Sequence, residues 1–288
     1  MPLRDSEAII LRSYSLGEAD RLVSFLSRSM GRMRGVAQGA RRPKSKFGSS
    51  LEMLSHVRIW WYERETRELV RISQCELDES FLAAHSDYEC GVALGLISEV
   101  TETILPEREA SDAAFRLLLL AARAISECAR SRALDVAAAS RPPLTGVNLE
   151  NDGDLKVAAT STLEATQTRD PLVPVTYFCL WTVKLGGWMP ELNSCTKCKR
   201  DLQDGAFASA MRPGMLCTEC RLPGYRALKG SSIKLARRMF QEKLEVFAQA
   251  QIDDASLQGL RDYLLDVIEH HAEKKLKTRR MLEPKQLM

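Results

Sequence analysis

The first 80 residues show the short alternating apolar pattern of β-strands. Residues 53–63 are the clearest case, because Val57, Ile59 and Trp61 would face one side of a strand and their neighbours the other. The region 39–50, rich in Gly, Ser and Pro, predicts a loop before this strand. Five strands at this spacing fit an OB-like barrel, which we expect, and an SH3-like barrel almost equally well. The predicted strands are residues 7–14, 21–28, 32–38, 53–63 and 69–77.

From residue 86 the apolar positions repeat every three to four residues, which predicts helices. The first would run from a Ser86–Glu89 capping box to Pro106, and the third would end at the Gly186–Gly187 pair. The predicted helices after the first are 112–130 (capped by Ser111 or Asp112), 173–185, about 232–250 (capped by Ser231 or Ser232), and one that starts at Asp253 or Asp254 with Leu257, Leu260, Leu264 and Val267 on one face.

Residues 141–170 break the helical pattern, and we predict a flexible insert there. The fold class expected from these patterns is α+β and multidomain. The predicted units are an OB-like barrel (1–80), an α-helical part (81–190 and 228–288) and, between the two helical stretches, a separate segment (191–227).

The composition is that of an ordinary globular protein, with 288 residues, 45% hydrophobic and 27% charged. No apolar run approaches the roughly 18 residues of a membrane span, so we expect no membrane partner. The first residues lack the features of a signal peptide, which predicts a cytoplasmic protein whose eight cysteines are not disulfides; the family resemblance given below adds the expectation that it is nucleoid-associated.

The strongest motif is a pair of CxxC turns, Cys195–Cys198 and Cys217–Cys220. Each turn offers two thiolates to one ion, and two turns complete the tetrahedron of a structural zinc site. Four unconnected buried cysteines are the alternative. We expect one structural Zn²⁺ per chain, with no ligand position left for catalysis. The other four cysteines have apolar neighbours and are predicted to be small packing residues: Cys75, Cys90, Cys128 and Cys179.

Charge is segregated more strongly than the net value of +3 suggests. Between Arg21 and Leu51 there are eight Lys and Arg residues and no acidic residue, which favours a polyanionic partner. Aromatic stacking surfaces would come from Phe47, Trp60 and Tyr62. The predicted DNA-binding residues are Arg32, Arg34, Arg41, Arg42, Lys44 and Lys46.

A second basic group closes the chain, and its role stays open between a favourable helix-dipole contact and DNA binding. It comprises Lys274, Lys275, Lys277, Arg279 and Arg280.

Catalytic motifs are missing from the sequence. It contains no GxGxxG, P-loop, HExxH or GxSxG pattern, and His271–Glu273 matches the HxE of zinc deaminases without the rest of that signature. We therefore expect no enzymatic activity and no small-molecule substrate.

The order of these features resembles the bacterial RecO family of recombination mediators along nearly the whole chain. The matching segments are Glu7–Arg12, Leu16–Val23, Gly31–Arg34, Ala37–Gly48, Leu185–Leu192 leading into the cysteine pairs, and Lys275–Arg280.

The resemblance implies an OB fold, a helical bundle and an inserted zinc finger. It also implies a non-enzymatic protein of DNA repair and recombination, which binds single- and double-stranded DNA and anneals complementary strands. Its implied partners are RecR and the C-terminal tail of single-stranded DNA-binding protein (SSB), and with RecR it would load RecA. The alternative function is a zinc-ribbon RNA-binding or transcription accessory protein, and a metalloenzyme would need an open zinc site.

Overall fold

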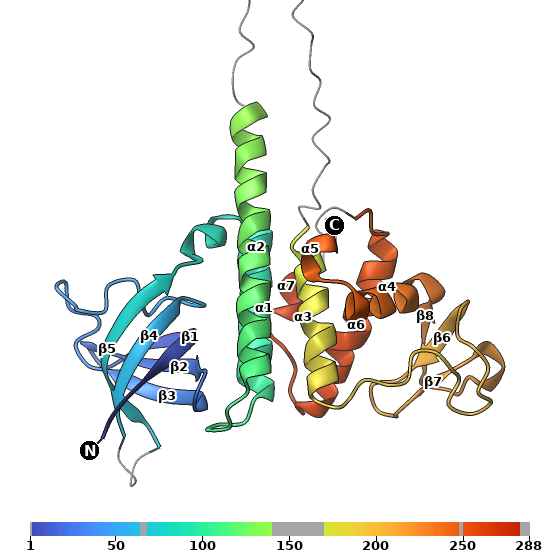
Figure 1. Ribbon diagram of the computed structural model, residues 1–288, viewed down its shortest axis with the longest axis horizontal. Coiled ribbons are helices and arrows are strands. Elements are labelled where there is room, and N and C mark those ends of the chain that lie inside the picture. Colours follow the sequence, from blue (N-terminus) through green and yellow to red (C-terminus); the bar gives the residue numbers. More distant parts are fainter. Residues whose placement is uncertain (1, 64–67, 140–169, 248–249, 283–288) are drawn as a thin grey trace, which may run out of the picture.

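A β-barrel lies at one end of the molecule, helices lie in the middle, and a small three-stranded sheet lies at the other end (Figure 1). The computed structural model describes residues 2–63, 68–139, 170–247 and 250–282. The predicted α+β class is confirmed. The predicted insert at 141–170 lies outside the described residues except for Asp170.

The five N-terminal strands close into a barrel in the order β1-β2-β3-β5-β4. β3 and β5 pair in parallel and the other neighbours pair antiparallel, which is the arrangement of an OB-like fold. All five predicted strands are present, and the first begins four residues earlier than expected. The strands are β1 (Leu3–Leu16), β2 (Asp20–Ser27), β3 (Gly31–Ala37), β4 (His56–Tyr62) and β5 (Val70–Glu79).

Alternation along the strands divides their apolar side chains between two cores. Val57, Ile59 and Trp61 of β4 are fully buried inside the barrel, as predicted. On β1, Ile9 and Leu11 point the other way and belong to the core that the helices form. The barrel and the helices therefore share one continuous apolar contact.

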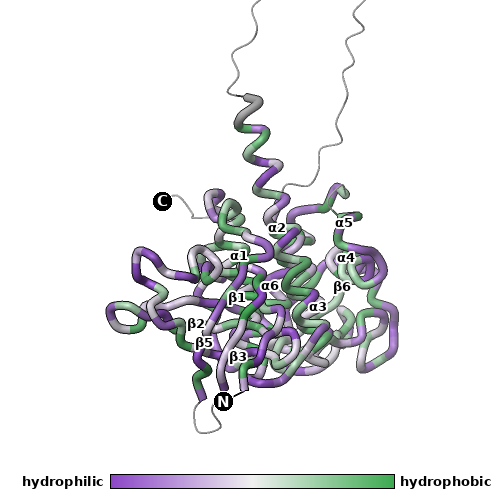
Figure 2. Tube along the Cα trace, turned by 60° about the vertical axis from the view of Figure 1, so that its left-hand side comes forward, coloured by the Kyte–Doolittle hydropathy of each residue, from purple (hydrophilic) through white to green (hydrophobic). Residues whose placement is uncertain are grey.

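The helices pack around α3, which is apolar over most of its length (Figure 2). α2 continues nine residues beyond the predicted end at Arg130, and its C-terminal end projects past the other helices (Figure 1). The elements are η1 (Leu82–Ser86), α1 (Tyr88–Ile104), α2 (Asp112–Ala139), α3 (Leu172–Leu185), α4 (Gly230–Gln241), α5 (Leu244–Phe247), α6 (Asp254–His271) and α7 (Arg279–Leu282).

Several helix ends differ from the predicted ones. The N-cap of α1 is Asp87, whose side chain accepts from the Cys90 N–H, so the capping box at Ser86 was wrong. The helix predicted to reach residue 250 stops at Gln241, because Glu242 is extended. The hydroxyl of Ser232 donates to the carbonyl oxygen of Ser256 on α6, and neither predicted serine caps α4.

Two other predicted helix ends are confirmed. The Asp253 side chain accepts from the Ser256 N–H and caps α6. Gly187, with φ of 74°, supplies the left-handed residue after α3, where its N–H donates to the Lys184 carbonyl.

The sheet at the far end contains β6 (Gly205–Ala208), β7 (Met215–Leu216) and β8 (Arg226–Lys229) in the order β7-β6-β8. These strands were not predicted, because segments of two to four residues are too short to show a period.

Candidate metal centre and nucleic-acid interface

Four cysteines beside the small sheet bring their sulfur atoms together. The Sγ atoms of Cys195, Cys198, Cys217 and Cys220 all lie within 4.8 Å of one another, and those of Cys198 and Cys217 are 3.6 Å apart. The predicted single cluster is confirmed, and it could bind one metal ion.

The first turn of the cluster is fixed by its backbone. The Thr196 N–H donates to the Met215 carbonyl oxygen of β7 at 2.9 Å, and Lys199, with φ of 61°, closes the turn. Gly214 has φ of 92°, and a Cβ there would lie 2.2 Å from Thr196 Oγ1. Only glycine allows this close approach between the two cysteine segments.

The donor set fits zinc. A tetrahedral site with Zn–S distances of about 2.3 Å places neighbouring sulfurs about 3.8 Å apart, close to the 3.6 Å between Cys198 Sγ and Cys217 Sγ. Burial raises the pKa of Cys195, but N–H groups of Cys198, Cys217 and Lys197 outweigh burial and lower this pKa to about 6. At Cys195 the backbone thus favours the thiolate that a metal requires, whereas a hydrogen bond with Cys198 raises the pKa of the Cys220 thiol to about 12.

The other cysteines have no such surroundings. Cys75, Cys90 and Cys179 are buried, and burial raises the pKa of the Cys75 thiol to about 11 and those of Cys90 and Cys179 to about 12. Cys128 is half-buried, and burial raises its pKa to about 11. These four residues stay protonated and act in packing.

The loop between β3 and β4 carries four exposed cationic side chains, here called the loop cations: Arg41, Arg42, Lys44 and Lys46. Within the described residues none of them forms an ion pair, and the Arg41 guanidinium donates instead to the Gly17 carbonyl oxygen at 2.9 Å. The loop is anchored because Phe47 and Leu51 are buried in the barrel core. A cationic loop on a fixed base can follow a phosphate backbone.

Arg32 and Arg34 on β3 have a different environment. They share a face, as predicted, and both contact Glu107 Oε1 from the α1–α2 loop, at 3.2 Å from Arg32 Nη1 and 2.9 Å from Arg34 Nε. The Arg32 Nε–H also donates to the Leu105 carbonyl oxygen at 2.8 Å.

The two remaining cations of this segment are neutralised as well. Arg21 pairs with Glu52 at 3.3 Å, and Arg28 pairs with Glu7 and Asp112, each at 2.7 Å. Four of the eight cations in the acid-free segment therefore form ion pairs with acidic residues from other parts of the chain.

Of the three aromatic residues proposed for stacking, Phe47 was wrong. Its ring is 3% exposed and packs inside the barrel, so no base can reach it. Trp60 and Tyr62 are half-buried on the outer side of β4, and the Arg58 guanidinium lies 5.8 Å from the Trp60 ring centroid. These two rings stay available for stacking.

Comparisons with known proteins agree on one family. The N-terminal model of recombination protein O matches residues 1–81, and its C-terminal model matches residues 158–280. A DNA repair protein RecO from Koribacter versatilis is 34% identical over 281 residues, which is 98% of each chain.

The chain belongs to the RecO family.

DNA repair proteins RecO from Cutibacterium acnes and Streptomyces avermitilis are 27% and 29% identical to it, and each alignment covers 78% of this chain. The alignments cover 76% and 77% of those relatives. Membership of the RecO family supports a role in DNA repair and recombination. None of the helices in the described parts of the chain combines the length and apolarity needed to cross a membrane.

The basic C-terminal segment that contributed to the RecO resemblance is bound by two buried carboxylates. Glu269 of α6, 6% exposed, accepts from Lys275 Nζ at 2.8 Å, Arg279 Nη1 at 3.0 Å and the Leu276 N–H at 3.0 Å. Hydrogen bonds and cations outweigh burial here and lower the pKa of Glu269.

Glu99 of α1, 2% exposed, holds the next part of this segment. Its carboxylate accepts from the Lys277 N–H at 3.0 Å, the Thr278 N–H at 2.9 Å and Thr278 Oγ1 at 2.7 Å. Burial raises the pKa of Glu99, but these bonds and Arg12 outweigh it and lower the pKa. Glu99 therefore ties the C-terminal segment to α1 and, through Arg12, to the barrel.

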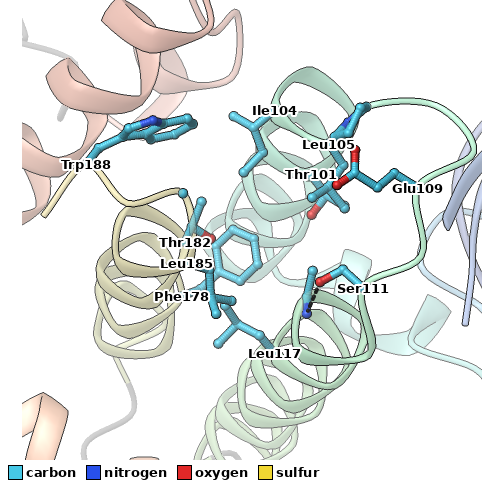
Figure 3. Close-up of a pocket in the computed structure, with 13 residues that line it drawn as sticks. Thr101, Ile104, Leu105, Glu109, Ser111, Leu117, Phe178, Thr182, Leu185 and Trp188 are labelled. Carbon is cyan, nitrogen blue, oxygen red and sulfur yellow. Dashed lines mark hydrogen bonds between the residues drawn. The ribbon is translucent and has the colours of Figure 1, made fainter.

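An apolar pocket of about 270 Å³ lies where the C-terminal ends of α1 and α3 meet the start of α2 (Figure 3). Ile104, Leu117, Phe178 and Trp188 line it, and Glu109 is its one ionisable residue within the described chain. The pocket is below the roughly 300–1,000 Å³ of small-molecule sites.

Sequence reasoning missed the acidic partners of the basic segments, namely Glu107, Glu99 and Glu269. Glu107 carries no signal in the sequence, because its role depends on contacts with β3, 73 to 75 residues away along the chain. Glu99 lies three residues after Leu96, within the apolar face of α1. A carboxylate at such a position is a signal of a buried, bonded charge.

Proposed function

We propose that this chain is a non-enzymatic mediator of recombinational repair that binds single- and double-stranded DNA and anneals complementary strands. The observation that carries the proposal is the set of loop cations on an OB-like barrel, exposed and without an ion pair among the described residues, in a member of the RecO family. A phosphate can bind these side chains without displacing an internal carboxylate.

Annealing follows from the same chemistry. Two complementary strands repel each other through their phosphates, and cations that neutralise both lower the repulsion that slows pairing. Since these contacts are to phosphate rather than to base edges, we expect little sequence preference. Trp60 and Tyr62 would add base stacking, which every base can provide.

The family supplies the rest of the proposal. We expect RecR and the SSB tail as partners, and RecA loading on SSB-coated DNA as the outcome. We propose no catalytic residue.

We also propose that the four cysteines hold one zinc ion with a structural role. Four sulfur ligands fill a tetrahedral zinc, which then stabilises the fold and leaves no position for a reactive water. The cluster is joined to the rest of the fold, because Cys195 and Cys217 belong to the core of the helices.

Replacing Cys195 and Cys198 by serine is expected to remove the metal and lower the melting temperature, because binding free energy of the metal is folding free energy. Metal content by mass spectrometry and thermal unfolding of the purified variant measure both effects. The matched control is Cys90→Ser together with Cys179→Ser, which should keep a full equivalent of zinc. Wild-type protein that contains no zinc when purified without chelator would overturn the assignment.

The function is tested by binding of labelled oligonucleotides at increasing salt. We expect single-stranded DNA to bind at low salt, with affinity that falls steeply as salt rises. Competition with RNA of the same sequence separates the proposal from an RNA-binding function. A clear preference for RNA, or no binding at low salt, would contradict the proposal.

A further inference from the structure

Glu107 occupies the place beside Arg32 and Arg34 where a phosphate would bind. One carboxylate oxygen contacts both guanidinium groups, at 3.2 and 2.9 Å. Among the described residues, Arg34 forms its one other ion pair with Glu68, whose carboxylate oxygen is 3.9 Å away and whose side chain is 88% exposed. Glu107 is therefore the main counter-charge of this arginine pair.

The loop that carries Glu107 is held against β3 by its backbone. The Arg108 N–H donates to the Arg32 carbonyl oxygen at 2.9 Å, and Gly31 packs so closely that a Cβ would lie 2.0 Å from the Glu109 carbonyl oxygen. These contacts do not involve the Glu107 carboxylate. The loop can thus stay in place while the Glu107 side chain, 35% exposed, turns away.

The contact between Glu107 and Arg34 is incomplete. Arg34 Nε is buried and has no hydrogen bond of good geometry, although the carboxylate oxygen is 2.9 Å away. A phosphate offers more acceptor oxygens and can satisfy both guanidinium groups. The arginine pair is neutralised by Glu107 but its hydrogen-bonding capacity is not filled.

We propose that Glu107 competes with DNA phosphate for Arg32 and Arg34. The DNA surface then has two parts, the loop cations, which are always available, and the arginine pair, which Glu107 withholds until phosphate displaces it. This inference rests on the proposed function. The Glu107 loop also forms a wall of the apolar pocket in Figure 3, through Leu105, Pro106 and Glu109, so a ligand in that pocket would contact the loop that carries the competitor.

The test is Glu107→Gln in the full, metal-loaded chain, measured by fluorescence anisotropy with a labelled single-stranded oligo(dT). Freeing Arg34, whose side chain is 40% exposed, and Arg32, whose side chain is 17% exposed, should raise affinity about threefold to tenfold at low salt. Because each single-strand phosphate contact contributes about 0.7 to the salt slope, the slope of log affinity against log salt should steepen by about 1.4.

Glu109→Gln is the matched control, since it removes the same charge from the same loop but faces the pocket. It should leave the slope unchanged. Equal effects of both variants, or weaker binding by Glu107→Gln, would overturn the inference.

Arg34→Gln, made in the wild-type chain and in the Glu107→Gln chain, gives a second test. In the wild-type chain it should change affinity by less than about twofold, and in the Glu107→Gln chain it should remove about half of the gain. A large loss from Arg34→Gln in the wild-type chain would show that Glu107 does not compete. Failure of the wild-type chain to bind DNA would instead reject the proposed function along with the inference.

Discussion

Two basic segments of this protein look alike in sequence, but only one of them has cations bound to buried carboxylates in the structure. The loop cations project from a loop between two barrel strands and form no ion pair among the described residues. In residues 274–280, by contrast, Lys275 and Arg279 bind the buried carboxylate of Glu269, and the backbone at 277 and 278 binds Glu99.

The difference shows that the function of a cluster of positive charges can be inferred only once the acidic partners of each cation in the structure are known. A cation already bound to a buried carboxylate must give up that contact to bind phosphate, and the carboxylate would then be buried without a partner. A loop cation breaks no ion pair among the described residues, and Arg41 gives up at most its hydrogen bond to the Gly17 carbonyl oxygen. We therefore propose that the loop cations bind DNA and that Lys275 and Arg279 have a structural role.

The largest expected effect is on DNA affinity. Changing all four loop cations to glutamate should lower single-stranded DNA affinity more than about a hundredfold at low salt and reduce the salt slope by about 2.8, for four lost phosphate contacts. Anisotropy with labelled oligonucleotides measures both quantities.

The control for this variant lies in the other basic segment. Changing Lys274, Lys277 and Arg280 to glutamate reverses exposed charges that have no ion pair among the described residues. We expect this triple variant to lose less than about threefold in affinity. Equal losses of DNA affinity in the two variants would show that the two basic segments contribute equally to DNA binding.

A smaller effect is expected on stability. Glu99→Gln replaces one carboxylate oxygen by a donor that faces the N–H groups of residues 277 and 278, and should cost about 1–3 kcal/mol in the free energy of unfolding. Urea unfolding measures the cost. Glu102→Gln, on the same helix but half-exposed in its ion pair with Arg12, should cost less than about 1 kcal/mol. Equal costs would show that the C-terminal segment does not depend on Glu99.

The same carboxylates predict how stability depends on pH. The folded-state pKa values of Glu99 and Glu269 are lowered, so between the folded and unfolded values the unfolded chain binds more protons. The stabilisation that these two carboxylates give the folded state is fully present above about pH 4.3, the ordinary pKa of Glu. It is lost as the pH falls through their lower folded-state pKa values. The double variant Glu99→Gln, Glu269→Gln should lose less of its free energy of unfolding than the wild type as the pH falls from neutral to acidic. An equal loss in both proteins would assign the acid sensitivity to other groups.

Local patterns predicted much of the fold. Alternation located the five barrel strands, and Asp253 marked the start of α6, because these signals come from neighbours along the chain. The cysteine spacing predicted the four-sulfur cluster for the same reason, since each CxxC turn contains two of its cysteines.

What the sequence did not reveal depends on contacts between distant segments. Phe47 seemed exposed in a polar loop, yet the loop folds it into the barrel core. Ser231 and Ser232 looked like caps for α4, but their hydroxyls bond Ser256 of α6. Glu107 reaches Arg32 and Arg34 only after α1 has packed against the barrel, so no periodicity could indicate it.

Annealing of complementary oligonucleotides coated with SSB is the most direct test of the central claim, that the loop cations are the DNA-binding surface of a strand-annealing mediator. The wild-type chain should accelerate annealing, and the chain with all four loop cations changed to glutamate should not, although its zinc content and melting temperature match the wild type. Annealing by that variant at the wild-type rate, or no acceleration by the wild-type chain, would contradict the claim.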